Sequence, residues 1–204
     1  MRLYIKSKFT KQLSFGYEEL AHKMWFKERE GKELSLSHSG NDEMLQEDCY
    51  IWLSYNKWNN DNRWCNKKIV DLHSPLRREM LGMEFENAFI SDYREKGDCL
   101  RLTSSHQTIL TVDKRAIYIM AIEVASALEG LISEDDKNTW LTIEEFISKH
   151  QDLLSLTFEE ANERSLEEIS TMEAVEEPLW EELDRLREAY IAKYGERVYP
   201  DDEE

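Results

Sequence analysis

The pattern of apolar and polar residues changes near the middle of the chain. Before residue 112, apolar residues alternate with polar ones over short runs, and this period of two predicts β-strands. The runs that we interpret as strands are Arg2–Lys6, Glu33–Ser37, Cys49–Tyr55, Cys65–Leu72, Cys99–Thr103 and Gln107–Val112. A polar turn at residues 58–64 separates the third run from the fourth, so we expect these two strands to form a hairpin.

One helix is expected within this strand-rich half. Its apolar residues recur at the spacing of one helical face, and a glycine that can adopt the left-handed conformation follows them at Gly31. The residues on that face are Tyr17, Leu20, Ala21, Met24 and Trp25.

The stretch from Ser74 to Tyr93 fits either period. Ser74 and Pro75 form a typical helix start, with a capping residue followed by proline in the first turn. The apolar residues that follow, Met80 and Met83 among them, suit a helix or a strand. We favour a helix for the first part and leave the rest open.

After residue 112 the helical period dominates. Asp113 is predicted to cap a central helix that ends at Gly130. This helix is apolar almost all round, so we expect it to be buried, with Val124 and Leu128 almost fully enclosed. An acidic turn and Trp140 follow it.

Three further helices are expected towards the C-terminus. Thr142 with Glu145, and Thr157 with Glu160, have the spacing of a capping box, in which each side chain bonds the other's backbone. The first box opens a helix to about residue 154. A last helix begins near Pro178 and ends at Gly195. Its inner face is predicted to hold Leu179, Leu183, Leu186 and Tyr190.

This segregation of strands and helices predicts an α+β fold. We expect an N-terminal, mostly antiparallel sheet with one or two helices, followed by a C-terminal run of three to four helices. Regular alternation of strands and helices, which a parallel sheet requires, is not seen.

The negative charge is concentrated in the last quarter of the chain. The 204 residues carry a net charge of −17, and residues 151–204 contain 18 Asp and Glu against 5 Lys and Arg. We therefore divide a single domain into an α+β body, residues 1–150, and an acidic helical extension, residues 151–204, packed on it. The negative electrostatic field of this extension repels nucleic acid and anionic membranes, and it attracts basic protein surfaces.

Composition also predicts where the protein works. No apolar run is long enough for a membrane span or for the core of a signal peptide. The three cysteines are odd in number and widely spaced, which favours reduced thiols over a disulfide framework. We expect a cytoplasmic protein that does not bind membranes.

No catalytic or metal-binding motif is present at a usable spacing. The five histidines and three cysteines match no common zinc pattern. Glu134, Asp135 and Asp136 are followed by Lys137 and lack the glycine of a calcium loop, so we interpret them as a solvated turn. The sequence therefore predicts no metal, no cofactor and no enzymatic activity.

Two segments are candidates for binding a partner. The first is the tryptophan-flanked turn, where we select Trp58, Asn60, Asp61 and Trp64. Large aromatic residues beside amides are typical of recognition loops, although the same pattern also suits a hairpin with aromatic residues in its core. The turn therefore stays open between the two interpretations.

The second candidate is the acidic segment after residue 157. We select Glu159, Glu160, Glu163, Glu167 and Glu168, which exceed what local pairing with the one nearby base, Arg164, requires. The alternative interpretation is a solvated helix face.

One part of the chain resembles small acidic bacterial proteins associated with toxin immunity. The resemblance runs from Thr111 to Phe146 and consists of an Ala/Ile-rich helix, an acidic turn, a tryptophan and a short helix. The pieces are Ile117–Leu128, Asp135-Asp136, Trp140 and Glu144-Glu145-Phe146. The resemblance implies a protein that binds and neutralises another macromolecule, and it carries over no functional residue.

We therefore predict a non-enzymatic binding protein of the immunity or inhibitor type. Its partner would be a basic protein whose natural ligand is nucleic acid. The acidic helices would imitate that nucleic acid. Two alternatives stay open. One is a small enzyme or ligand-binding domain with its site near the tryptophan-flanked turn, and the other is a scaffold protein that self-associates through its last helix.

Overall fold

The computed structural model describes most of the helical half of the chain and the strands of the first half. The described residues are 1–9, 13–25, 36–40, 50–56, 78–85, 99–105, 109–171, 185, 187–193 and 195. The chain divides into two compact units, Met1–Ser170 and Thr171–Glu204. Helices as far as residue 170 belong to the first unit.

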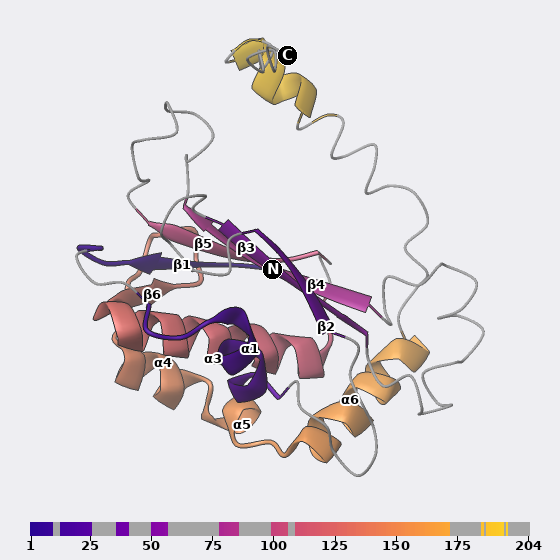
Figure 1. The fold of residues 1–204 in the computed structure, drawn as a ribbon. Helices are drawn as coiled ribbons and strands as arrows, with labels where there is room; N and C mark the ends of the chain where they lie inside the picture. Colours follow the sequence, from indigo (N-terminus) through magenta and orange to yellow (C-terminus); the bar gives the residue numbers. More distant parts are fainter. Residues whose placement is uncertain are drawn as a thin grey trace. The chain divides into compact units, whose positions relative to one another are not determined.

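The first unit is built on one antiparallel sheet, and the predicted α+β class is confirmed (Figure 1). Within the described residues, six strands lie in the order β2-β3-β4-β5-β1-β6, and every neighbouring pair is antiparallel. The strands are β1 (Arg2–Lys6), β2 (Leu36–Gly40), β3 (Tyr50–Asn56), β4 (Arg78–Phe85), β5 (Leu100–Ser104) and β6 (Leu131–Ser133).

The helices lie on one face of this sheet (Figure 1). They are α1 (Tyr17–Lys23), α3 (Thr111–Leu128), α4 (Ile143–Lys149), α5 (Gln151–Leu154) and α6 (Phe158–Thr171). Helix α3 occupies the centre, where it contacts three strands and the helices α1, α4 and α5.

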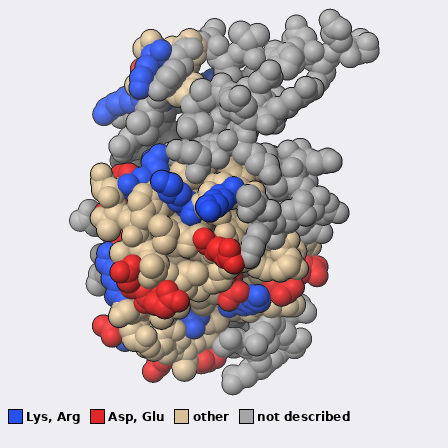
Figure 2. Space-filling view, turned by 90° about the vertical axis from the view of Figure 1, so that its left-hand side faces the viewer, with Lys and Arg blue, Asp and Glu red and all other residues tan. Residues whose placement is uncertain are grey.

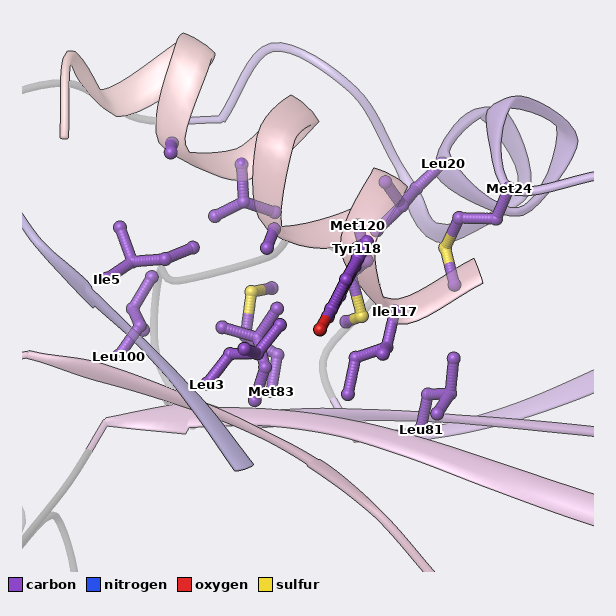
Figure 3. Packing of buried hydrophobic residues seen from close by; sticks show 14 of the residues in the cluster. Leu3, Ile5, Leu20, Met24, Leu81, Met83, Leu100, Ile117, Tyr118 and Met120 are labelled. Atoms are coloured by element: carbon purple, nitrogen blue, oxygen red, sulfur yellow. The ribbon is translucent and has the colours of Figure 1, made fainter. Parts of the chain in front are cut away.

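The core lies between the sheet and α3. Figure 3 shows side chains of the strands, such as Leu3 and Leu81, pointing towards Ile117 and Met120 of α3. Val124 is fully buried and Leu128 is 3% exposed, which confirms the predicted buried helix. Burial of such side chains is the main source of stability in a unit of this size.

Within the stretch that fits either period, residues 78–85 form strand β4 and not a helix, while Ser74 and Pro75 lie outside the described residues. The eight residues from Arg78 to Phe85 pair with β3 on one side and with β5 on the other. Gly82 allows this pairing, because a Cβ atom there would lie 2.6 Å from the ring of Trp52 on β3. The spacing of the apolar residues in this segment fits both the helical and the strand period. Pairing with the neighbouring strands therefore determines its conformation.

Both neighbours of β3 are therefore taken, by β2 and by β4. The partner that we expected for β3 in a hairpin, Cys65–Leu72, lies outside the described residues. The other predicted strands are confirmed in β1, β3 and β5, and β2 lies slightly later than predicted.

The start of α3 is also earlier than predicted. The helix begins at Thr111 after Leu110, so no strand reaches Val112, and Asp113 lies in the first turn instead of capping it. Its side chain has a different role, because the buried hydroxyl of Tyr55 donates a hydrogen bond to Asp113 Oδ1 over 2.8 Å. Burial first, and then the charge of Asp113, raises the pKa of Tyr55 well above its ordinary value.

Two helices do not end at the glycines where we predicted their ends. Helix α1 stops at Lys23, and Trp25 follows with a φ of 96°. Gly31 lies outside the described residues. At the end of α3 the left-handed residue is Glu129, with a φ of 52°, while Gly130 packs where a Cβ atom would lie 3.0 Å from the Lys6 carbonyl oxygen.

The segment after α3 contains one strand that the pattern did not predict. Strand β6 has three residues and pairs with β1, and Ile132 forms a further bridge with Leu141. The capping box of Thr142 and Glu145 is confirmed, and the helix that it opens divides at His150 into α4 and α5.

Within the second unit, residues 187–193 are helical. The N–H of Gly195 donates to the carbonyl of Ile191 over 2.8 Å, and its φ is +86°, as expected of a glycine that ends a helix. Tyr190, which we assigned to an inner face, is 38% exposed. The other residues of that predicted face, Leu179, Leu183 and Leu186, lie outside the described residues.

Candidate interaction surface on helix α6

Helix α6 begins with its own local cap. The N–H of Glu160 donates to Thr157 Oγ1 over 3.2 Å, and Glu160 Oε2 accepts from the N–H of Thr157 over 2.8 Å. This reciprocal pair is the predicted capping box. The hydrogen bonds from the Thr157 backbone and hydroxyl lower the pKa of Glu160. The cap therefore requires no other part of the chain.

The inner side of α6 starts with an aromatic contact. Phe158 is 5% exposed, and its ring meets the Trp25 ring edge to face at 5.3 Å between centroids. On the same tryptophan lies the guanidinium of Arg115 from α3, 3.7 Å from the ring centroid. Arg115 also donates from Nε to the Leu154 carbonyl over 3.2 Å. These contacts connect the N-terminal end of α6 with α3 and α5.

Further along, α6 provides the cap that α3 lacks. Leu110 at the N-cap of α3 makes no side-chain hydrogen bond. Instead the N–H of Val112 donates to Ser165 Oγ over 2.9 Å, and the N–H of Thr111 donates to Glu168 Oε2 over 2.9 Å. The Thr111 hydroxyl donates to the other oxygen of Glu168. Two orphan donors of α3 are thus satisfied by side chains from a helix about 50 residues later.

The outer side of α6 presents carboxylates. Glu159, Glu163 and Glu167 are exposed and stand at i, i+4 and i+8, so they form one row along the helix. Glu160 and Arg164 lie beside this row and are also exposed. We call Glu159, Glu163 and Glu167 the outer row.

The structure thus separates the five glutamates that we selected. Four are exposed on α6, whereas Glu168 is half-buried and holds Thr111. Glu160 combines exposure with its role in the cap. Their predicted role in binding a partner stays a prediction. The other selected residues, Trp58, Asn60, Asp61 and Trp64, lie outside the described residues.

Sequence reasoning missed Ser165 altogether. Its hydroxyl donates to the Ala161 carbonyl over 2.8 Å while its oxygen accepts from Val112, and the residue is fully buried. A serine in the interior of a helix pattern gives no sign of such a partner. The one available signal was that α3 begins without a capping side chain once the start is placed at Thr111.

The acidic turn after β6 is ordered by its own contacts. Asp135 Oδ1 accepts from the N–H of Thr139 over 2.8 Å and from the hydroxyl of Ser133 over 2.9 Å. These bonds, from Thr139 first, lower the pKa of Asp135 to about 2. No group of three or more His, Cys, Asp or Glu within the described residues is placed to hold a metal ion.

Neighbouring Glu134 is bound by two bases. It pairs with Lys149, and its Oε2 lies 2.7 Å from His150 Nε2. Burial alone would raise the pKa of Glu134, but the hydrogen bonds and charges of Lys149 and His150 outweigh it and lower that pKa. Figure 2 shows acidic side chains interspersed with Lys and Arg on the side of the molecule that it faces. The outer row of α6 contains three carboxylates, and Arg164 lies beside it.

Comparison with known proteins adds no relative. No family model, no curated protein and no solved structure matches this chain. Among the helices within the described ranges, none has the length and apolar character that crossing a membrane requires.

Proposed function

We propose that this chain is a non-enzymatic binding protein that neutralises or regulates a basic protein partner through the outer face of α6. The observation that supports the proposal is the outer row, three exposed carboxylates aligned on a helix whose opposite side is fixed to the body. The partner would present a surface rich in Lys and Arg, as proteins that bind nucleic-acid phosphates do.

The outer row places like charges next to one another along the helix. Like charges four residues apart destabilise a helix by about 0.2–0.5 kcal/mol per pair, and the row contains two such pairs in succession. A helix that needed only solubility would be better served by alternating Glu and Lys. A positively charged ligand would reduce this repulsion, which is consistent with a basic partner.

The fixed inner side strengthens the argument. Binding loses free energy when flexible groups must be ordered, and a helix held by Phe158, Ser165 and Glu168 is ordered beforehand. Carboxylates at the rim of a contact mainly raise the association rate. The expected partner therefore associates fast at low ionic strength, and more slowly as salt shortens the Debye length to about 8 Å at physiological concentration.

The test compares three forms of the intact chain in capture from a native extract. One is unchanged, one carries Glu159→Gln, Glu163→Gln and Glu167→Gln, and the control carries the same charge change elsewhere. The control substitutions are Glu18→Gln, Glu144→Gln and Asp152→Asn, all at exposed positions. We expect one stoichiometric basic protein on the unchanged and control forms and its loss from the outer-row form.

The association rate of the captured protein is then measured against salt. We expect a fall of one or more decades in the outer-row form and a steep decline with ionic strength in the unchanged form. A partner that binds all three forms equally and ignores salt would contradict the proposal. Retention of a small molecule, or of another copy of the chain alone, would instead support one of the two alternatives.

A further inference from the structure

The first turn of α3 binds a carboxylate from another helix of the same chain. An α-helix begins with backbone N–H groups that have no partner within the helix, and its dipole places partial positive charge there. In this protein α3 is 18 residues long, and the group bound at its N-terminus is the carboxylate of Glu168. Each oxygen of that carboxylate accepts a hydrogen bond from Thr111, one from the N–H over 2.9 Å and one from the hydroxyl.

Ser165 completes the same contact. It lies one helical turn before Glu168 on α6, so both side chains point to the same side of the helix. Its oxygen takes the next N–H of α3, that of Val112, over 2.9 Å. These two side chains of α6 therefore accept hydrogen bonds from two successive backbone N–H groups of α3.

This contact and the aromatic contact hold α6 at two separated points. Phe158 and Glu168 are ten residues apart, which corresponds to about 15 Å along a helix. Ala161 and Ile169 on the inner side of α6 are also buried, at 0% and 2% exposed, so the polar contact at Glu168 adds to an apolar inner strip.

We infer that Glu168 is a positioning residue for the proposed interaction surface. Its carboxylate fills the anion site of α3 and thereby fixes the direction in which the outer row points. The inference rests on the proposed function for its consequence, but the positioning itself is testable without any partner. Glu167 offers a matched comparison, because it is the adjacent residue with the same charge and is exposed in the outer row.

The first measurement is amide hydrogen exchange on the free chain. In Glu168→Ala we expect exchange of the α6 amides, and of Thr111 and Val112, to accelerate at least tenfold. In Glu167→Ala, which changes the net charge equally, we expect less than a twofold change. Equal exchange in the two variants would overturn the inference.

The second measurement asks whether the vacated place binds an anion. Sodium acetate is compared with sodium chloride at equal ionic strength. Acetate should restore protection in Glu168→Ala, because its carboxylate can accept from Thr111, and it should leave Glu167→Ala unchanged. If acetate and chloride act alike, no carboxylate site exists at the start of α3 and the inference fails.

Ser165→Ala provides an independent variant if Glu168→Ala does not fold. It removes the acceptor for Val112 and retains every charge. Faster exchange at Val112 and in the second half of α6 supports the two-residue contact, and unchanged exchange there overturns it.

A partner found through the outer row separates the two proposals. Glu168→Ala should slow its association several-fold more than Glu144→Ala does, since Glu144 is an exposed glutamate outside the outer row and general electrostatic attraction treats the two alike. Equal slowing would reject the positioning role and leave the proposed function standing. A partner unaffected by the outer row would reject the proposed function, while the exchange and acetate results would still decide the anion site.

Discussion

Helices α3 and α6 begin in opposite ways. Helix α6 carries its own capping box at Thr157 and Glu160, so its first turn is satisfied by neighbours in sequence. Helix α3 follows Leu110, and its first two N–H groups are satisfied by Ser165 and Glu168 from α6. The start of α6 is therefore stabilised by residues close in sequence, whereas the start of α3 depends on residues about 50 positions later in the chain.

The two helices also differ in what covers them. Ten residues of α3 are buried, and several of them lie in the central cluster between sheet and helices. Helix α6 buries an inner strip and leaves its outer row in solvent. The comparison shows that α3 forms the core but depends on α6 for its start, while α6 can form its first turn without α3. Substitutions in α3 should therefore act on the whole unit, and those at the start of α6 should act locally.

The largest effect is expected in α3. Leu128→Ala should lower the free energy of unfolding by about 2–5 kcal/mol, because the site is 3% exposed and the cavity would be enclosed by the central cluster. Urea unfolding measures the change. Ser126→Ala, at an exposed position of the same helix, should change the stability by less than about 0.5 kcal/mol. Similar losses in both would contradict the assignment of α3 as the core helix.

A smaller effect is expected at the local cap. Thr157→Ala should cost about 1 kcal/mol, the usual loss when a capping hydroxyl is removed. Hydrogen exchange should show the loss mainly in the first turn of α6 and leave the amides of α3 nearly unchanged. Thr142→Ala in the equivalent box of α4 provides the control, with a similar loss in its own helix. If Thr157→Ala accelerated hydrogen exchange in α3 as strongly as in α6, the conclusion that α6 begins locally while the start of α3 depends on distant residues would be wrong.

The smallest effect concerns acid. The pKa of Glu160 is lowered in the folded state, so its contribution to stability is present above the ordinary pKa of a glutamate. That contribution is lost as pH falls through the lower folded value. Glu160→Gln should therefore flatten the acid limb of the stability profile slightly. An NMR titration of the carboxyl group gives the direct measurement, and a midpoint at or above the ordinary glutamate value would refute the assignment.

Local signals were predicted from the sequence with good success. Both capping boxes are confirmed, because each is complete within four residues and needs no distant partner. The buried character of α3 followed from an apolar pattern on all sides. Strands β1, β3 and β5 also agree with their alternating runs.

Several positions that the pattern left open or placed wrongly depend on distant residues. Met80 and Met83 suit either period, and only pairing with β3 and β5 makes that segment a strand. Asp113 has the chemistry of an N-cap, but Tyr55 takes its carboxylate. Strand β6 is three residues long and exists because β1 offers it an edge.

The negative charge of the candidate surface was predictable from the sequence, whereas the different roles of its glutamates were not. Glu167 and Glu168 are adjacent and identical in type, and no pattern distinguishes them. Only the position of α3 assigns one to the outer row and the other to Thr111. The turn with Trp58 and Trp64 lies outside the described residues, so its role stays a prediction.

The place of β1 in the sheet has a consequence for biosynthesis. This strand lies between β5 and β6, so it pairs with residues that leave the ribosome about 100 and 130 residues after it. Leu3 and Ile5 must stay uncovered until then, in a nascent chain where exposed apolar strands are prone to aggregation. Long-range pairing of this kind folds slowly. A nascent chain stalled before residue 131 would present one side of β1 as an open edge.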